Sequence, residues 1–250
     1  MIFCNLKGGL GNILFQVAAT FEFANKNNVD CSFPNLYRHL SFLEKEKNCN
    51  PRLTNVDHYR HFFRVLRTDN PPPNTPTVMF PYHYEEKCIS PPCIIDGFFQ
   101  SEKYFLNSRN RILDLFPHRE QNNKVSIHVR RGDYLTKTKF HNVLDIDYYL
   151  KAIEYFPGRE FVIFSDDLEW CRSAFVGDRF SFFRGKHDLE DLFMMSSCHS
   201  NIISNSSFSW WAAWSNNHED KKVIAPKKWV GPSLSHLDTK DVQCSNWLQL

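Results

Sequence analysis

The chain has 250 residues, of which 42% are hydrophobic, 23% charged and 15% aromatic, and its formal net charge is +2. This composition excludes a disordered chain, because such chains are poor in aromatic residues and rich in net charge. The small net charge also gives no basic stripe of the kind that nucleic-acid-binding proteins carry, so we expect no nucleic-acid partner. The length allows one large domain or two of about 125 residues.

The N-terminal segment, MIFCNLKGGLGN, lacks the basic region and the long apolar run of a signal peptide. No stretch reaches the roughly 18 apolar residues that span a bilayer. We therefore expect a soluble, cytoplasmic protein without a transmembrane segment. Because the eight cysteines form no CxxC pair, we expect free and mostly buried thiols rather than a zinc site. The glycosylation sequon at Asn205 is expected to be silent.

In the first half of the chain, three glycines interrupt the pattern between a predicted strand and a predicted helix. The predicted elements are a strand at 2–6, a helix at 14–24, strands at 30–33 and 94–98, and a short helix capped by Ser101. Residues 35–93 show no clear pattern apart from a proline-rich loop at 71–76. The polar segment 117–123 predicts a linker that separates a domain at 1–122 from a domain at 123–250.

In the second half, predicted strands and helices alternate regularly. The strands are at 125–130, 161–164, 180–183, 201–204 and 223–225, and the helices are at 147–155, 188–197 and 207–214. Asp166 and Glu169 fit a capping box for one more helix, and the pair Asp166-Asp167, which ends a strand, is expected to cap it. This alternation predicts an α/β fold with a parallel sheet and helices on both faces. Ligands bind beyond the C-terminal ends of the strands in such sheets.

The segment HVRRGDY, residues 128–134, is a candidate anion site. Alternation along the predicted strand puts Val125, Ile127 and Val129 on one face. His128 and Arg130 then share the other face, and Arg130 lies at the C-terminal end of the strand. A guanidinium group suits phosphate because it is planar and bidentate. The alternative is a surface arginine pair that forms a salt bridge with Asp133.

Two loops before predicted helices are further candidates for anion binding, because helix N-termini present free N–H groups. One is the glycine loop at 7–12, which fits neither a dinucleotide fingerprint nor a P-loop and is otherwise a tight turn. The other is the segment 205–211, where ordinary capping by Asn205 or Ser206 is the alternative. The tryptophans at 210, 211 and 214 are expected to pack in the core.

Several acidic residues are candidates for chemistry, each with a capping alternative. Asp145 and Asp147 form a DxD pattern of the kind that holds a metal in some sugar-nucleotide enzymes. They lead straight into a predicted helix, so we favour capping. Asp191 lies within the first turn of its helix and has the same alternative. A hydrolytic serine triad is unsupported, because the sequence contains no GxSxG elbow.

Taken in order, the motifs GGLGN with Phe15-Gln16, FQSEKY, HVRRGDY, FSDD and SNSSFSWWAAW resemble the inverting α-1,2-fucosyltransferase family. The resemblance touches nearly the whole chain except about residues 35–90, and HVRRGDY is its most specific piece. It implies a GT-B-like fold in which two Rossmann-like domains face a donor and acceptor cleft. It further implies GDP-β-L-fucose as donor, a galactose-containing glycan as acceptor, and no metal or other cofactor.

The resemblance also implies roles for individual residues. Arg130 would contact the donor phosphates and His128 would lie near the guanosine. Asp191 would read the guanine base, and the serine pair Ser206 and Ser207 would meet the β-phosphate, together with the helix N-terminus at Phe208. Gly11 and Asn12 would close over the donor from the other domain. The family loop reads GNQMFQ, but Ile13 stands here in place of the glutamine.

The sequence therefore predicts a glycosyltransferase that moves L-fucose to a galactoside hydroxyl with inversion, forming an α-1,2 linkage. The N-terminal domain would carry the acceptor and the C-terminal domain GDP-fucose. Arg130 and Asp133 are the catalytic candidates, and Asp133, His141 and Glu102 are candidates for a general base. The alternatives are a metal-dependent glycosyltransferase using Asp145 and Asp147, and a non-catalytic glycan-binding module.

Overall fold

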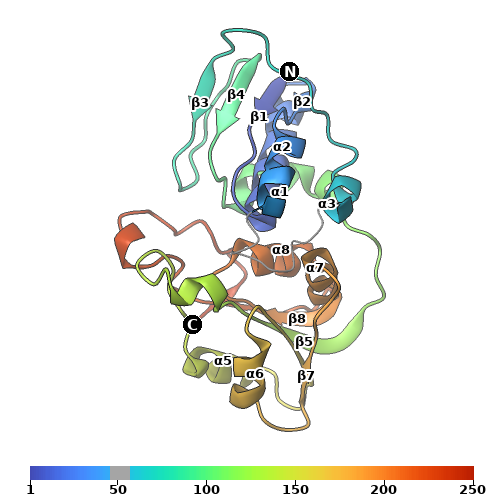
Figure 1. Cartoon of the computed structure of the whole chain (residues 1–250), viewed down its shortest axis with the longest axis vertical. Coiled ribbons are helices and arrows are strands. Elements are labelled where there is room, and N and C mark those ends of the chain that lie inside the picture. The colour runs from blue at the N-terminus through green and yellow to red at the C-terminus, as the bar shows by residue number, and fades with distance from the viewer. Residues whose placement is uncertain (46–56) are drawn as a thin grey trace. The chain divides into compact units, whose positions relative to one another are not determined.

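The computed structural model of the chain describes residues 1–45 and 57–250. Its contacts form two compact units. The first comprises Met1–Phe116 with Asp238–Val242, and the second comprises Pro117–Leu237 with Gln243–Leu250. Each unit contains a parallel sheet with associated helices, as the ribbon in Figure 1 shows. The predicted α/β class with two Rossmann-like units is thereby confirmed.

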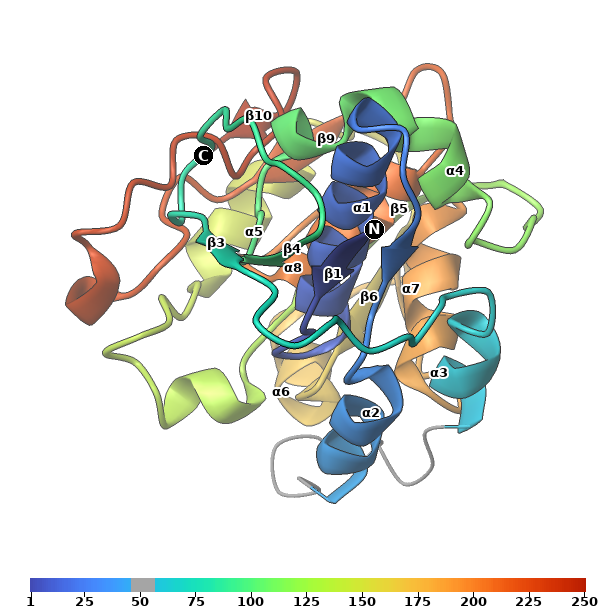
Figure 2. The same cartoon turned by 90° about the horizontal axis from the view of Figure 1, so that it is seen from above.

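Within its described residues, the first unit has a four-stranded parallel sheet in the order β2-β1-β4-β3. The strands are β1 (Ile2–Cys4), β2 (Cys31–Ser32), β3 (Thr77–Met79) and β4 (Cys93–Asp96). The helix α1 (Leu10–Lys26) packs against β1 and is visible beside it in Figure 2. Because α1 is apolar around most of its circumference, it is buried from Leu10 to Ala24 on nearly every face.

The second unit has a six-stranded parallel sheet within residues 117–250, in the order β10-β9-β8-β5-β6-β7. The strands are β5 (Asn122–Val129), β6 (Phe161–Ser165), β7 (Phe180–Phe182), β8 (Cys198–Ile202), β9 (Val223–Ala225) and β10 (Leu248–Gln249). The first strand in sequence, β5, is therefore central, with β6 on one side and β8 on the other. The order reverses between β5 and β8, which is where doubly wound sheets bind nucleotides.

Helices cover both faces of this second sheet. They are α5 (Ile146–Ile153), α6 (Leu168–Ala174), α7 (Asp188–Ser196) and α8 (Ser207–Ser215). The apolar core on one face joins Val125, Ile127 and Val129 of β5 to side chains of α5 and α6. On the opposite face, His128 of β5 contacts Phe208 of α8, with 5.6 Å between the ring centroids. The predicted alternation along this strand is thus confirmed.

The division of the chain differs from the predicted boundary at 122/123. The second unit begins at Pro117, where the Arg119 guanidinium lies 5.2 Å from the centre of the Phe193 ring of α7. Residues 238–242 return to the first unit, where Asp241 forms an ion pair with Lys103. Part of the predicted linker is also strand, because β5 begins at Asn122.

Several short elements of the first half were not predicted. They are α2 (Leu36–Lys45), α3 (Asp57–Phe62), β3, α4 (Arg109–Leu113) and a 3-10 turn at Leu106–Ser108. The short helix predicted after Ser101 is a 3-10 turn at Glu102–Tyr104, and Ser101 caps it as predicted, since its side chain accepts a hydrogen bond from the Lys103 amide. None of the helices in the described part of the chain is long and apolar enough to cross a membrane.

The cysteine prediction is confirmed for the residues that the structure describes. The free thiols at positions 4, 31, 93, 171, 198 and 244 are buried. Cys88 is free and exposed, and Cys49 lies outside the described residues. Burial raises the pKa of the Cys4 and Cys198 thiols to about 12, so these groups stay protonated and unreactive.

Candidate active site

The candidate site of the second unit lies where the strand order reverses. Arg130 follows the C-terminal end of β5, and Ser206 follows that of β8. His128 of β5 joins the two strands, because its Nδ1 lies 2.8 Å from the Ser204 hydroxyl. Burial, and secondarily the charge of Arg130, lower the pKa of His128 to about 3. The imidazole is therefore neutral at physiological pH and contributes hydrogen bonds rather than charge.

Arg130 is held between two carboxylates. Its Nη2 donates to Asp133 Oδ1 at 2.6 Å, and its Nη1 lies 2.9 Å from Asp166 Oδ2. The side chain is 26% exposed, and its guanidinium lies 5.4 Å from the centre of the Tyr134 ring. The ion pair with Asp133 anticipated as the alternative reading is therefore present. Arg130 is nevertheless largely buried, and the second carboxylate fixes its orientation.

Arg131 points elsewhere and has different partners. Its Nε donates to Asp167 Oδ2 at 3.1 Å, and its guanidinium lies 4.0 Å from the centre of the Trp170 ring of α6. The two adjacent arginines therefore diverge at the end of β5. Of the two guanidinium groups, that of Arg130 contacts the acidic pair Asp133 and Asp166, whereas that of Arg131 contacts Asp167.

The predicted capping of α6 is confirmed for Asp167, which accepts a hydrogen bond from the Trp170 amide at 3.2 Å, and is wrong for Asp166. Asp166 accepts the Arg131 amide on Oδ1 at 2.9 Å and pairs with Arg130 through Oδ2. Gly132 permits this close approach, since a Cβ there would lie 2.5 Å from Asp166 Oδ2. Sequence reasoning missed the role of Asp166 in this site, because its partners Arg130 and Arg131 are distant in the sequence.

The N-terminus of α8 has no side-chain cap. Ser206 occupies the N-cap position but makes no capping hydrogen bond within the described structure. Asn205 does not cap either, because its amide nitrogen donates to the Asn142 and Trp229 carbonyls at 2.9 and 3.0 Å. The first-turn N–H groups, including those of Ser207 and Phe208, lack partners within the helix itself. They give the helix start a partial positive charge, which suits an anion.

Asn205 and the tryptophans of this segment are buried. The Asn205 amide is buried, at 4% exposure, and both its N–H bonds point inward. A glycosylating enzyme would have no access to this nitrogen. Trp210, Trp211 and Trp214 are at most 2% exposed, which confirms their expected place in the core.

Asp191 lies in the first turn of α7, on the same face of the sheet as α8, against which α7 packs. It is 4% exposed, and its Oδ1 accepts the Gly185 amide at 2.7 Å. The neighbouring Glu190 accepts the Lys186 amide at 2.6 Å in the same way. Both carboxylates thus close the loop before α7. The helix follows β7, so its first turn lies at the edge of the sheet that also carries Arg130.

The glycine loop of the first unit is shaped around Asn12. Gly8 has a φ of +79°, and a Cβ there would lie 2.6 Å from Asn12 Nδ2. Gln16 bridges the loop, because its side chain accepts the Lys7 amide at 3.0 Å and donates to the Lys7 and Asn12 carbonyls at 2.8 Å. Gly11 is buried in the first turn of α1. The glycine, asparagine and glutamine of this motif therefore hold the loop in its conformation.

Two successive hydrogen bonds orient the Asn12 side-chain amide. Gln100 Nε2 donates to Asn12 Oδ1 at 2.7 Å, and the Tyr82 hydroxyl donates to Gln100 Oε1 at 2.6 Å. Gln100 follows Phe99, which is fully buried and holds a left-handed φ of +52°. Such a conformation is uncommon for a non-glycine residue and is often found near functional sites. Ile13, where the family has glutamine, is fully buried in α1 and offers nothing to a ligand.

The remaining acidic and basic candidates fall into structural roles. Asp145 caps α5 by accepting the Tyr148 amide at 3.1 Å, and Asp147 is exposed in the same first turn. His141 stacks on Tyr134, with 4.0 Å between ring centroids, and burial lowers its pKa. Glu102 lies in the first 3-10 turn of the other unit. Of the three candidates for a general base, Asp133 contacts Arg130 directly.

The second unit is a Rossmann-like unit with an arginine and an uncapped helix N-terminus at its switch point, the place where such sheets bind ligands. The profile of glycosyl transferase family 11 matches residues 86–250. The O-antigen biosynthesis glycosyltransferase WbnK of Escherichia coli is 31% identical, over 98% of this chain and 99% of that protein. The chain belongs to glycosyl transferase family 11, which confirms the family resemblance drawn from the motifs.

Two further relatives bear on the reaction. An α-1,2-colitosyltransferase of Escherichia coli is 35% identical, over 62% of this chain and 61% of that protein. A galactoside 2-α-L-fucosyltransferase of Mus musculus is 32% identical, over 36% of this chain and 28% of that protein. The protein is therefore a glycosyltransferase of a family whose relatives carry α-1,2-transferase names.

Proposed function

We propose that the protein transfers L-fucose from GDP-β-L-fucose to a galactoside hydroxyl, with inversion, to form an α-1,2 linkage. The proposal rests on one observation. Arg130, which Asp133 and Asp166 hold in place, and the uncapped N-terminus of α8 both lie at the switch point of the sheet. The motifs shared with α-1,2-fucosyltransferases and the galactoside fucosyltransferase among the relatives support the donor and the acceptor.

In the proposed reaction, negative charge grows on the leaving GDP as the bond to the fucose C1 breaks. Arg130, the serine hydroxyls at 206 and 207, and the first-turn N–H groups of α8 stabilise that charge in an already organised site. The sugar passes through an oxocarbenium-like state, and the acceptor hydroxyl oxygen bonds to C1 from the opposite face, which inverts the configuration. The hydroxyl loses its proton as this bond forms, and Asp133, beside Arg130, is the proposed base that accepts it.

Product analysis tests the proposal directly. The purified protein is incubated with GDP-fucose and a panel of galactosides, and linkage is determined by NMR. An α-1,2-fucosylated galactoside is the expected product. The α-1,2-colitosyltransferase relative favours one second candidate, transfer of colitose, so a GDP donor carrying colitose is the comparison. Faster transfer from that donor would show that colitose, not fucose, is the sugar transferred.

A thermal-shift measurement distinguishes an enzyme that uses a GDP donor from a glycan-binding module. Saturating GDP at one hundred times its Kd should stabilise the folded state by about 2.7 kcal/mol, because it binds the native state alone. UDP should shift the melting temperature less. No shift with any nucleotide would favour the binding module.

Transfer is expected to survive EDTA. Asp145 is occupied in capping α5, and the charge of GDP can be stabilised by Arg130 and helix N–H groups instead of a cation. Initial rates before and after exhaustive chelation provide the measurement. Loss of activity on chelation, with recovery on addition of Mn²⁺, would favour the metal-dependent alternative through Asp145 and Asp147.

Asp191→Asn is expected to raise the KM for GDP-fucose by about tenfold or more. A carboxylate accepts charge-assisted hydrogen bonds from the N1 and N2 edge of guanine, worth roughly 1.5–3 kcal/mol, whereas an amide presents a donor there. A fucose donor with another base should be affected less. Glu190→Gln is the matched control, because Glu190 closes the same loop by accepting the Lys186 amide. Equal effects of the two substitutions on KM would show that Asp191 closes the loop and does not bind guanine.

Gln100→Leu is expected to raise the KM for GDP-fucose by about three- to tenfold, since it removes the hydrogen bond to Asn12, worth roughly 0.5–1.5 kcal/mol. Combined with Asn12→Ala it should add nothing, because both act through one amide. Gln243→Leu is the control for loss of a buried glutamine, since Gln243 donates to the Pro226 carbonyl in the other unit. Additive losses would show that Gln100 does not act through Asn12.

A further inference from the structure

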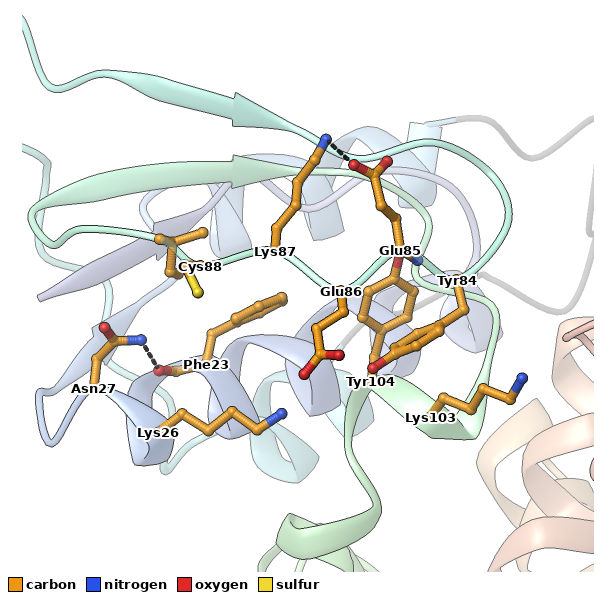
Figure 3. Close-up of a pocket in the computed structure, with 11 residues that line it drawn as sticks. Phe23, Lys26, Asn27, Tyr84, Glu85, Glu86, Lys87, Cys88, Lys103 and Tyr104 are labelled. Carbon is orange, nitrogen blue, oxygen red and sulfur yellow. Dashed lines mark hydrogen bonds and ion pairs between the residues drawn. The ribbon is translucent and has the colours of Figure 1, made fainter.

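The first unit contains a hollow of about 270 Å³ that the proposed reaction does not use. It lies between the last turn of α1, at Phe23 and Lys26, and the segment 84–89, with Lys103 and Tyr104 on its remaining side (Figure 3). Its lining combines aromatic rings with charged and amide groups. Ligand pockets have this mixed character, in which apolar surfaces are joined by a few oriented polar groups.

The pocket is held open by hydrogen bonds within the protein. The Tyr104 hydroxyl accepts the Glu85 amide at 3.0 Å and donates to the His83 carbonyl at 3.1 Å. The Tyr84 ring packs edge-on against Tyr104, with 4.9 Å between the centroids. Segment 83–85 is therefore anchored to the aromatic wall, and a ligand would not have to order it on binding.

The charges of the pocket are balanced. Lys87 pairs with Glu85 at 3.1 Å, and Lys103 pairs with Asp241. Lys26 lies 3.7 Å from Glu22. An anionic ligand would have to compete with these carboxylates, whereas hydroxyl groups can both donate and accept among such paired groups. The exposed Glu86 carboxylate points into the same space as the Lys26 ammonium, as Figure 3 shows.

A neutral sugar ring matches this lining better than a charged ligand does. Its C–H face can lie against the aromatic ring of Tyr84, and its hydroxyl rim can bond to Glu86 and Lys26. The pocket adjoins the last turn of α1, whereas Asn12 is in the first. Fourteen residues of helix separate Asn12 from Lys26, which is about 20 Å. A sugar held here is therefore not the one beside the glycine loop.

We propose that this pocket is a second glycan-binding site, which holds one neutral sugar of a long acceptor chain at a distance from the reacting galactoside. The proposal rests on the proposed function, because it takes the acceptor to be a glycan. It predicts that long acceptors bind more tightly than short ones, since two linked contacts raise the effective concentration of the reacting end.

The test compares two acceptors, methyl β-galactoside and a β-1,4-linked galactohexaose. In Glu86→Gln and Tyr84→Ala, the KM for galactohexaose should rise about tenfold. The KM for methyl β-galactoside, the KM for GDP-fucose and kcat should stay unchanged. Glu154→Gln and Tyr155→Ala are the matched controls, because both residues are exposed on the second unit, outside the pocket. Glu86 is exposed, so its substitution leaves folding intact.

A binding measurement without donor separates this proposal from the proposed function. NMR titration of the whole protein with galactohexaose should show saturable binding that Glu86→Gln weakens and Glu154→Gln does not. Equal binding by the two variants, or equal KM values for galactohexaose, would overturn the second site. Absence of any transfer from GDP-fucose by the wild-type protein would overturn the proposed function instead. The titration would still show whether the pocket binds a glycan.

Discussion

Arg130→Lys is expected to lower kcat by about 10²–10³, equivalent to roughly 2.7–4 kcal/mol of transition-state stabilisation, by analogy with the loss of an oxyanion-hole donor. Arginine bridges Asp133 and Asp166 and keeps further N–H groups for phosphate. Lysine retains the charge but loses this planar fork. The loss should appear in kcat, because charge on the departing GDP grows as the bond breaks.

Arg131→Lys is the matched control. Arg131 pairs with Asp167 and lies over Trp170, away from the acidic cluster around Arg130. Its substitution should cost some stability and little kcat. Steady-state kinetics on both purified variants, with circular dichroism to verify folding, provide the comparison. Small and equal losses at the two positions would show that the phosphate lies elsewhere.

Asp166→Asn is expected to lower kcat by about ten- to a hundredfold, because charge-assisted hydrogen bonds are worth roughly 1.5–3 kcal/mol. The amide would present a donor to either the Arg130 guanidinium or the Arg131 N–H, both of which need acceptors. Asp166 is a positioning residue in this interpretation. Combined with Arg130→Lys, the substitution should therefore cost much less than the sum of the two separate losses.

Two further variants sharpen this test. Gly132→Ala would displace the same carboxylate, since the new Cβ would lie 2.5 Å from Asp166 Oδ2. This substitution should reproduce the kcat loss. Asp167→Asn removes the adjacent carboxylate, which caps α6, and should cost about 1 kcal/mol of stability with little change in kcat. Additive losses for Asp166→Asn and Arg130→Lys would contradict a positioning role.

The sequence alone determined the features that depend on local spacing. Alternation along residues 125–129 places the apolar side chains in the core and His128 on the opposite face, as the structure confirms. The strand, glycine loop and helix at the start of the chain follow from the same kind of pattern. So does the capping role of Asp145. Periodicity and capping act within a few residues, which is why one sequence suffices to predict them.

Only the tertiary structure decided which distant groups meet. Asp166 rather than Asp167 reaches Arg130 because β5 and β6 pair in the register that sets Val129 opposite Ser165. Gln100 reaches Asn12 across 88 positions, a contact that no local pattern encodes. The free N-terminus of α8 likewise depends on Asn142 and Trp229, which occupy the Asn205 amide. Such contacts depend on strand register and loop path, which are set by packing over the whole unit.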